Sequence, residues 1–459
     1  MIKININHIC KIGGLFLFLN FIACNTKEKH PANINNEIVH EVAQVPEAGK
    51  VYDRNTQSNS SYSVYIPKNY SGKEKYPVII FLDPHGKGNF PVEKYKELAE
   101  KFHFLLIGSN DSKNGMNIEQ SMKFAGDLLN EASTVLPGKS PEISLAGFSG
   151  GAKVALVGGN TIPGFSNTIY CGAALSPGSI RINVPLLAIA GNHDMNYTEV
   201  KNFNQSIDKS GIPHTFIEWK GKHEWPDTST FIHAFYWNLF TSMRKKVIEK
   251  NEGIINGFKK MIESAINNEK NLLVKALFLQ EEIEMLKEIS LVNDYKTKLI
   301  SLINSIQFKQ AKSNQDKTLA FEDQRKMEFA EAFENRELPW WNNQIQLLNA
   351  DKNNESNQRI LGYISLAAWS YSSKAVAVNN SKFAQKVLEV YKLADPENSE
   401  QPFLEACLYS KNEMQDSAIY FLKEAIRLGL VDRSKIENEK ELFVLRGRSD
   451  FQELIGKMR

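Results

Sequence analysis

The sequence predicts an α/β domain with a mostly parallel sheet, followed by an all-helical region. Continuous apolar runs alternate with amphipathic segments between residues 76 and 244, which is typical of parallel strands covered by helices on both faces. After residue 245 no strand-like run occurs, and apolar residues recur at helical spacings. The length of 459 residues exceeds what one compact core accommodates, so two domains are expected.

The first part is predicted to begin with an antiparallel hairpin. Residues 51–54 and 62–66 are strand-like and flank a polar stretch, and Pro67 ends the second strand. The apolar runs that follow predict buried strands with helices between them. We expect strands at 78–82, 104–108, 169–175, 185–190 and 214–219, one strand ending at residue 146, and helices at 92–102, 118–136, 152–157, 197–210 and 228–244.

The second part, residues 245–459, is predicted to be helical. Ala384 and Ala418 lie 34 residues apart, as do Leu388 and Leu422. This spacing is the tetratricopeptide period. The region resembles degenerate tetratricopeptide repeats, clearest over residues 365–430, and an irregular helical bundle is the alternative. No repeat is assigned to residues 245–364.

An apolar run near the start of the sequence predicts export. The run is residues 12–23 (IGGLFLFLNFIA), with Lys11 directly before it and Lys3 further upstream. It has the length of the hydrophobic segment of a signal peptide and is shorter than a typical membrane-spanning helix. The run ends in FIAC, which resembles the lipobox of bacterial lipoproteins. The resemblance implies removal of residues 1–23, lipid attachment at Cys24, and a location in the bacterial cell envelope, facing the periplasm or the surface. Cleavage without lipidation is the alternative.

Residues 24–49 are polar and predict a flexible tether, which leaves 50–244 and 245–459 as the two folded domains.

The composition excludes several classes of function. The chain has 55 basic and 53 acidic residues, and removal of Lys3 and Lys11 with the leader leaves 53 of each. This balance does not suit a nucleic-acid-binding protein. No cluster has metal-ligand spacing and no phosphate-binding loop is present, so neither a metal nor a cofactor is expected.

The two cysteines that follow the tether are Cys171 and Cys407. They fall in different predicted domains. We expect two buried free thiols rather than a disulfide.

The sequence Gly147-Phe148-Ser149-Gly150-Gly151 matches the G-x-S-x-G pattern of a nucleophile elbow. It lies between a buried strand and a helix-forming run, the setting in which this pattern has its meaning. Glycines two residues before and two after Ser149 leave room for a strained turn. The amide of Gly150 opens the helix and would point at an oxyanion formed beside the serine.

A serine nucleophile needs a base beside it and an acid that orients the base. In nucleophile-elbow enzymes the acid, and then the base, follow later strands. Asp194 follows the strand at 185–190, and His223 follows the last strand at 214–219. Because the carboxyl ends of parallel strands meet at one edge of a sheet, we expect Ser149, Asp194 and His223 to meet there.

Three other residues compete for these roles. Asp227 is an alternative acid, but it follows the base rather than a strand. His193 precedes Asp194 on the same loop and is expected to shape its turn. His85 is expected to anchor its own loop.

Residues 51–244 resemble the α/β-hydrolase fold without a lid insertion. The sequences GKHEWP at 221–226 and LDPHGKG at 82–88 are similar to secreted esterases related to polyhydroxyalkanoate depolymerases, feruloyl esterases and dienelactone hydrolases. The resemblance implies that the loop after the third strand supplies a second oxyanion amide, from Lys87 or else Gly86, beside that of Gly150. Asp83-Pro84 stands where those families have an apolar lead-in.

These observations together predict an exported serine hydrolase that cleaves carboxylic esters through an acyl-enzyme. The substrate is expected to be bulky, polymeric or linked to a polysaccharide, because the sequence leaves no room for a cap. A peptidase or amidase on the same fold remains open. So does a non-catalytic protein that binds a protein partner through its helical tail.

Overall fold

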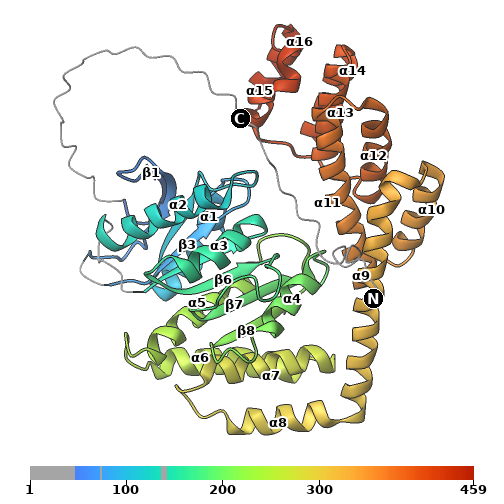
Figure 1. Cartoon of the computed structure of the whole chain (residues 1–459). Helices are drawn as coiled ribbons and strands as arrows, with labels where there is room; N and C mark the ends of the chain where they lie inside the picture. Colours follow the sequence, from blue (N-terminus) through green and yellow to red (C-terminus); the bar gives the residue numbers. More distant parts are fainter. Residues whose placement is uncertain (1–46, 73–74, 136–141, 459) are drawn as a thin grey trace, which may run out of the picture.

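The computed structural model describes residues 47–72, 75–135 and 142–458 (Figure 1). The first part holds one sheet of eight strands in the order β1-β2-β4-β3-β5-β6-β7-β8. β1 and β2 form the predicted antiparallel hairpin, β2 pairs antiparallel with β4, and all later pairs are parallel. The strands are β1 (Val51–Asn55), β2 (Ser61–Tyr65), β3 (Val78–Leu82), β4 (Leu105–Ser109), β5 (Ile143–Phe148), β6 (Phe165–Cys171), β7 (Leu186–Gly191) and β8 (His214–Trp219).

Helices cover both faces of this sheet, as the continuous apolar strands predict. In β3 the alternate residues Ile79 and Phe81 face a cluster that includes α1 and α5, while Ile80 and Leu82 face a cluster that includes α2 and α3. α4 packs beside α3 over the β6–β8 end of the sheet. The helices are α1 (Asn89–Phe102), α2 (Ile118–Asn130), α3 (Gly150–Thr161), α4 (Tyr197–Ser206) and α5 (Thr228–Arg244).

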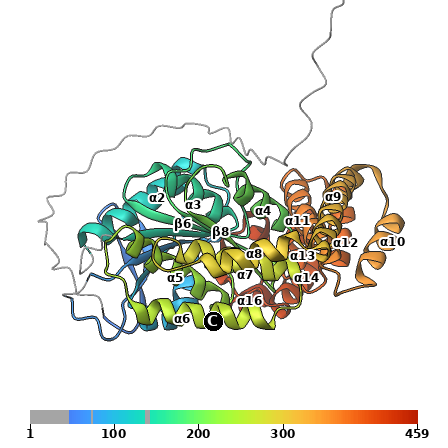
Figure 2. The same cartoon turned by 90° about the horizontal axis from the view of Figure 1, so that it is seen from below.

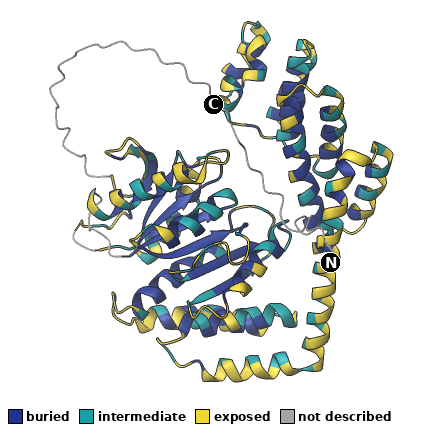
Figure 3. Cartoon of the chain, in the orientation of Figure 1, coloured by how far each residue is buried: buried dark blue, intermediate teal, exposed yellow. Residues whose placement is uncertain are grey.

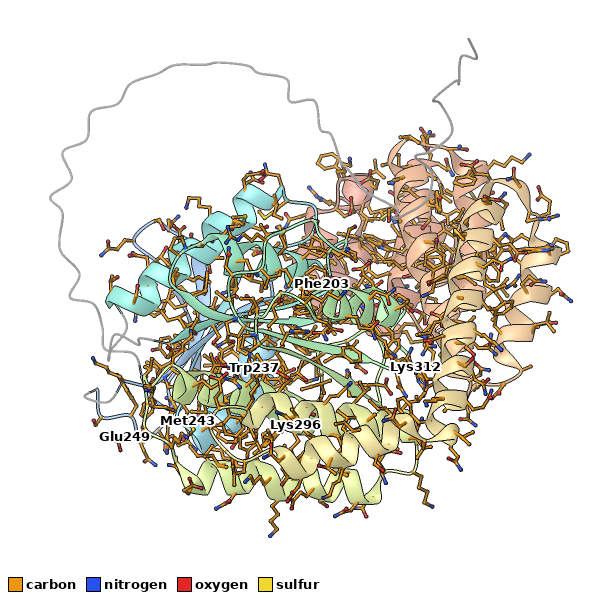
Figure 4. The ribbon with its side chains drawn as sticks, turned by 60° about the horizontal axis from the view of Figure 1, so that its bottom comes forward. Phe203, Trp237, Met243, Glu249, Lys296 and Lys312 are labelled. Atoms are coloured by element: carbon orange, nitrogen blue, oxygen red, sulfur yellow. The ribbon has the colours of Figure 1, made fainter. Side chains whose placement is uncertain are left out.

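The helical part has two different packing environments. The core around α1 and α5 continues into α6 and α7, with Phe258 and Met285 in the same buried cluster as Trp237 of α5. Figure 4 labels Trp237, which lies between the sheet and α7. A second core begins at Phe329 of α9 and extends to Ile455 of α16. Figure 3 shows that α8 and the adjoining end of α9 are largely exposed between these two cores.

The described part of the chain after residue 245 contains no strand, as predicted. Its elements are α6 (Glu252–Asn268), α7 (Leu272–Leu286), α8 (Asn293–Asn304), α9 (Ile306–Asn335), α10 (Leu338–Asn349), α11 (Glu355–Ala377), α12 (Ser381–Ala394), α13 (Glu400–Lys411), α14 (Gln415–Arg427), α15 (Arg433–Asn438), η2 (Lys440–Leu445) and α16 (Ser449–Gly456). The tetratricopeptide assignment stays a prediction.

The bounds of several predicted elements were wrong, those of β6, α2 and α4 among them. The strand predicted at 169–175 is β6, which begins at Phe165 and ends at Cys171, because Gly172 adopts a left-handed φ of 66°. Its first half is polar, and Asn167 Nδ2 donates to Asn238 Oδ1 of α5 at 2.9 Å, so the apolar pattern does not reveal it. The helix predicted at 118–136 gives way to a π-helical turn, η1 (Glu131–Val135), and α4 ends at Ser206 rather than 210.

Cys171 and Cys407 are buried free thiols, as predicted. The leader, the lipidation site at Cys24 and most of the tether lie outside the described residues. Within the part of the chain that is described, no helix is both long enough and apolar enough to cross a bilayer.

Glu282 of α7 has no exposed surface, and this burial raises the pKa of its carboxyl to about 7. A carboxyl whose pKa is higher in the folded protein than in the unfolded chain makes folding less favourable as the pH rises through that interval. We therefore expect Glu282→Gln to raise the unfolding temperature at pH 8 and not at pH 5. Calorimetry at the two pH values measures this, with Glu284→Gln on the same helix as the control. Equal effects of Glu282→Gln at both pH values would contradict the prediction.

Candidate active site

Ser149 lies at a strained turn between β5 and α3. Its backbone has φ 52° and ψ −120°, a conformation that non-glycine residues rarely adopt. The amide of Ser149 donates to the carbonyl of Cys171 at 2.9 Å, which ties the turn to the neighbouring strand. The serine is partly exposed.

The two glycines of the motif allow close backbone approaches. A Cβ on Gly147 would lie 2.1 Å from the carbonyl oxygen of Gly151, and a Cβ on Gly151 would lie 2.0 Å from the carbonyl oxygen of Leu82. Both distances are far below van der Waals contact. Only glycine fits at these positions, as the motif predicts.

The strain at Ser149 predicts a stability effect. Glycine adopts positive φ without a steric penalty, so Ser149→Gly is expected to be more stable than Ser149→Ala by about 1 kcal/mol. Both variants lose the hydroxyl, so the difference between them does not include the loss of its contact with His223. Urea unfolding of the two variants measures it, and equal midpoints with equal slopes would argue against strain at this turn.

The structure brings the three predicted triad residues together. His223 Nε2 lies 2.9 Å from Ser149 Oγ, and His223 Nδ1 lies 3.0 and 3.1 Å from the two carboxylate oxygens of Asp194. The Asp194 side chain is 1% exposed and that of His223 is 21% exposed. Asp194 is therefore shielded from water, while Ser149 and His223 are partly exposed. The Phe148 ring lies 4.8 Å from the His223 ring and packs beside it.

The loops that carry Asp194 and His223 are joined through their backbones. Asp194 follows β7 and His223 follows β8, two strands that pair in parallel. The amide of Asn192 donates to the carbonyl of Trp219 at 2.8 Å, and that of His193 donates to Gly221 at 2.9 Å. The amide of Asn196 donates to Asp194 Oδ1 at 2.8 Å, which leaves that carboxylate held from two sides.

The predicted oxyanion donors differ in their surroundings. Gly150 is the first residue of α3, where amides have no acceptor within the helix. In the loop after β3, the Lys87 amide donates to Asp83 Oδ1 at 3.4 Å and the Gly86 amide donates to the Asp83 carbonyl at 3.2 Å. At 3.4 Å the Lys87 bond is long and weak, so its amide is held less firmly within the loop than that of Gly86.

Asp83 has a role that sequence reasoning missed. Its buried carboxylate accepts hydrogen bonds from Trp225 Nε1 and from the amide of His85, both at 2.9 Å. Burial tends to raise the pKa of Asp83, but the hydrogen bonds from His85 and Trp225 outweigh it and hold that pKa below its ordinary value. Since Trp225 lies two residues after His223, Asp83 links the loop after β3 to the loop that carries His223. The hydrogen bond from Trp225 therefore explains why a polar residue, Asp83, stands in this loop.

Two further contacts at the site come from distant parts of the chain. The Asn114 side chain lies against the Cα of Gly150, so closely that a Cβ there would meet its Oδ1 at 1.8 Å. The Lys87 side chain pairs at 3.4 Å with Asp432, which directly precedes α15. Neither contact leaves a signal in the local sequence.

The three competing residues lie in other roles. Asp227 accepts from the amide of Thr230 at 2.7 Å and caps α5. The ring of His85 is mostly exposed, with Nδ1 3.5 Å from Asp83. Burial lowers the pKa of His193, whose amide joins the two loops as described above. Within the described residues no group of His, Cys, Asp and Glu could hold a metal ion.

No protein-family model matches this sequence, and no curated protein matches it. Several solved structures of esterases and hydrolases are similar to it. An esterase from Pyrobaculum calidifontis is 12% identical with a TM-score of 0.34, and the match covers 44% of this chain and 87% of the esterase. The S-formylglutathione hydrolase of Staphylococcus aureus is 13% identical with a TM-score of 0.35, over 41% of this chain and 98% of that one.

An inhibited esterase B from Lactobacillus rhamnosis is 15% identical with a TM-score of 0.36, over 45% of this chain and 92% of the esterase. The sheet, with an antiparallel hairpin first, parallel strands after it and the strained turn at Ser149 after β5, agrees with the fold class predicted from the sequence. The first part of this chain has the α/β-hydrolase fold, and an all-helical region follows it.

Proposed function

We propose that this protein is a serine hydrolase that cleaves carboxylic esters. The observation that carries the proposal is the continuous contact from the Asp194 carboxylate through the His223 ring to the Ser149 hydroxyl. Three groups of these types in this order are what nucleophilic catalysis by serine requires. The strained turn at Ser149 supports the proposal, because strain of this kind gathers at functional sites.

In the proposed reaction Ser149 Oγ attacks the ester carbonyl while His223 Nε2 takes the hydroxyl proton. Asp194 keeps the Nδ1 proton facing it and stabilises the imidazolium that forms. The Gly150 amide, with Lys87 as the second donor, holds the tetrahedral oxyanion, and each donor is worth about 3 kcal/mol by analogy with measured cases.

Collapse of this intermediate breaks the carbon–oxygen bond of the ester, and His223 returns the proton to the departing alcohol. Water then attacks the acyl-enzyme with His223 again acting as base. This second collapse releases the carboxylic acid and restores the serine hydroxyl. Atoms and protons balance over the two halves, and no cofactor enters either of them.

Reaction with a fluorophosphonate probe tests this proposal. The purified protein should react covalently, and peptide mass spectrometry should place the adduct on Ser149. Turnover of p-nitrophenyl esters against aminoacyl and acyl anilides then separates an esterase from a peptidase or amidase. A protein that neither reacts with the probe nor turns over any of these substrates would favour the non-catalytic alternative.

The proposal includes export and a lipid anchor at Cys24. Its support is the apolar run at residues 12–23 and the FIAC sequence that ends it. An enzyme held at a membrane in the cell envelope would meet esters outside the cytoplasm. Bulky, polymeric or polysaccharide-linked esters are the substrates we propose.

A further inference from the structure

The loop that carries Asp194, residues 191–196, is hereafter the acid loop. Two of its backbone carbonyls accept hydrogen bonds from helices of the second part of the chain. Arg359 Nη1 of α11 donates to the Asn192 carbonyl at 2.6 Å, and Lys326 Nζ of α9 donates to the Met195 carbonyl at 2.8 Å. These donors lie 167 and 131 residues later in the sequence. They hold the loop two residues before and one residue after the proposed catalytic acid.

The two cations form one buried cluster with Glu322. Arg359 Nε lies 2.8 Å from Glu322 Oε2, and Lys326 Nζ lies 2.7 Å from Glu322 Oε1. The side chains of Glu322, Lys326 and Arg359 are 0, 12 and 4% exposed, so water competes little for these contacts. We call these three residues the clamp.

Other contacts fix the clamp against the α/β domain. The Arg359 guanidinium lies 5.0 Å from the ring centroid of Tyr197, the first residue of α4. Asn192 Nδ2 donates to Glu355 Oε1 at 2.8 Å. α11 also passes close to the acid loop, since a Cβ on Gly362 would lie 3.5 Å from that of Met195. Figures 1 and 2 both show α9 and α11 beside α4, at the end of the sheet where the acid loop lies.

We propose that Lys326 and Arg359 are positioning residues, through which the helical region sets the place of the Asp194 carboxylate. This inference rests on the proposed function. The carboxylate must keep both oxygens near 3 Å from His223 Nδ1, and displacement of a catalytic group by 1 Å costs about 100-fold in rate. Cations that hold carbonyls on both sides of Asp194 resist such a displacement. The helical region is then a part of the catalytic unit and not only a tail that binds partners.

Substitution of Lys326 tests the proposal in the full-length protein. Lys326→Met removes the donor to Met195 and leaves Glu322 paired with Arg359, so the cluster keeps a balanced buried pair. We expect kcat for p-nitrophenyl acetate to fall about 10-fold with KM within about twofold, because the loss concerns placement and not substrate binding. Lys326→Arg, which restores a donor, should recover most of the loss.

Lys411→Met is the matched control. Lys411 Nζ also donates to a backbone carbonyl, that of Ala377 at 2.9 Å, and lies 3.8 Å from a glutamate, Glu441. Both partners belong to the helical region, away from the acid loop. This variant should keep the kcat of the parent protein. An equal fall of kcat in Lys326→Met and Lys411→Met would overturn the proposal.

A double-mutant cycle separates positioning from a general loss of stability. If Lys326 acts through Asp194, Lys326→Met should not further slow fluorophosphonate labelling in an Asp194→Asn background, whereas independent effects would multiply. Arg359→Lys, which keeps the charge but lacks the planar fork that joins Glu322 to Asn192, is the second variant for the same cycle. Undiminished labelling by both single variants overturns the proposal.

The proton between His223 Nδ1 and Asp194 gives a readout that does not depend on turnover. Its downfield NMR signal should be present in the parent protein and in Lys411→Met, and should weaken or shift in Lys326→Met. A parent protein that neither labels nor turns over esters would overturn the proposed function, and the NMR comparison would then decide the positioning role alone. An unchanged signal in Lys326→Met overturns that role.

Discussion

Ser149→Ala is expected to lower kcat for p-nitrophenyl acetate about 10⁵- to 10⁶-fold, by analogy with the removal of the serine from other triad enzymes. The hydroxyl is the atom that forms the acyl-enzyme, and no other hydroxyl donates to His223 Nε2 among the described residues. The measurement is the steady-state rate at saturating ester, corrected for spontaneous hydrolysis.

The control for Ser149→Ala is Ser206→Ala. The Ser206 hydroxyl donates to the carbonyl of Phe203 within α4 and takes no part in the proposed site. That variant should keep the parent rate, and both variants should unfold cooperatively. Retention of more than a tenth of the parent rate by folded Ser149→Ala would remove the enzyme proposal.

Asp194→Asn is expected to lower kcat about 10⁴-fold while the protein stays folded. Asparagine has nearly the shape of aspartate, but its amide no longer favours the tautomer that carries a proton on Nδ1, and it does not stabilise the imidazolium. KM should change little, because the group does not touch the substrate in the proposed reaction. Steady-state kinetics at several pH values measures both constants.

A second His–Asp pair supplies the control for Asp194→Asn. His214 Nε2 lies 3.0 Å from Asp208 Oδ1, and His214 Nδ1 lies 2.8 Å from the carbonyl of Ile212. This pair joins the same two residue types at the opposite end of β8, through the other ring nitrogen. Asp208→Asn should leave kcat unchanged. A loss of less than tenfold in Asp194→Asn would assign the role of the acid to another group.

The helical region touches the predicted catalytic loops at two places. Asp432 pairs with Lys87 of the loop after β3, and the clamp holds the acid loop. The region after residue 245 therefore helps to form the surroundings of Ser149. The boundary predicted between the two domains at residue 245 marks a change in composition. The buried core of the α/β part does not end there, because it continues through α6 and α7.

Much of the candidate site follows from local sequence. The strained turn at Ser149 is encoded within five residues, because the glycines around it permit approaches that a Cβ forbids. Asp194 and His223 are found by counting strands, since parallel strands place the residues that follow them at one edge of the sheet. The roles of these residues remain predictions that the variants above test.

The tertiary structure alone decided the contacts that hold the site in place. Nothing near Lys326 or Arg359 in the sequence marks them as partners of the acid loop, and nothing near Asp83 marks it as the acceptor for Trp225. The physical reason is that local patterns encode backbone conformation and the burial of a face. Which distant side chain meets a given carbonyl depends on how whole helices pack, and in this protein α9 and α11 pack against the end of the sheet that carries Asp194.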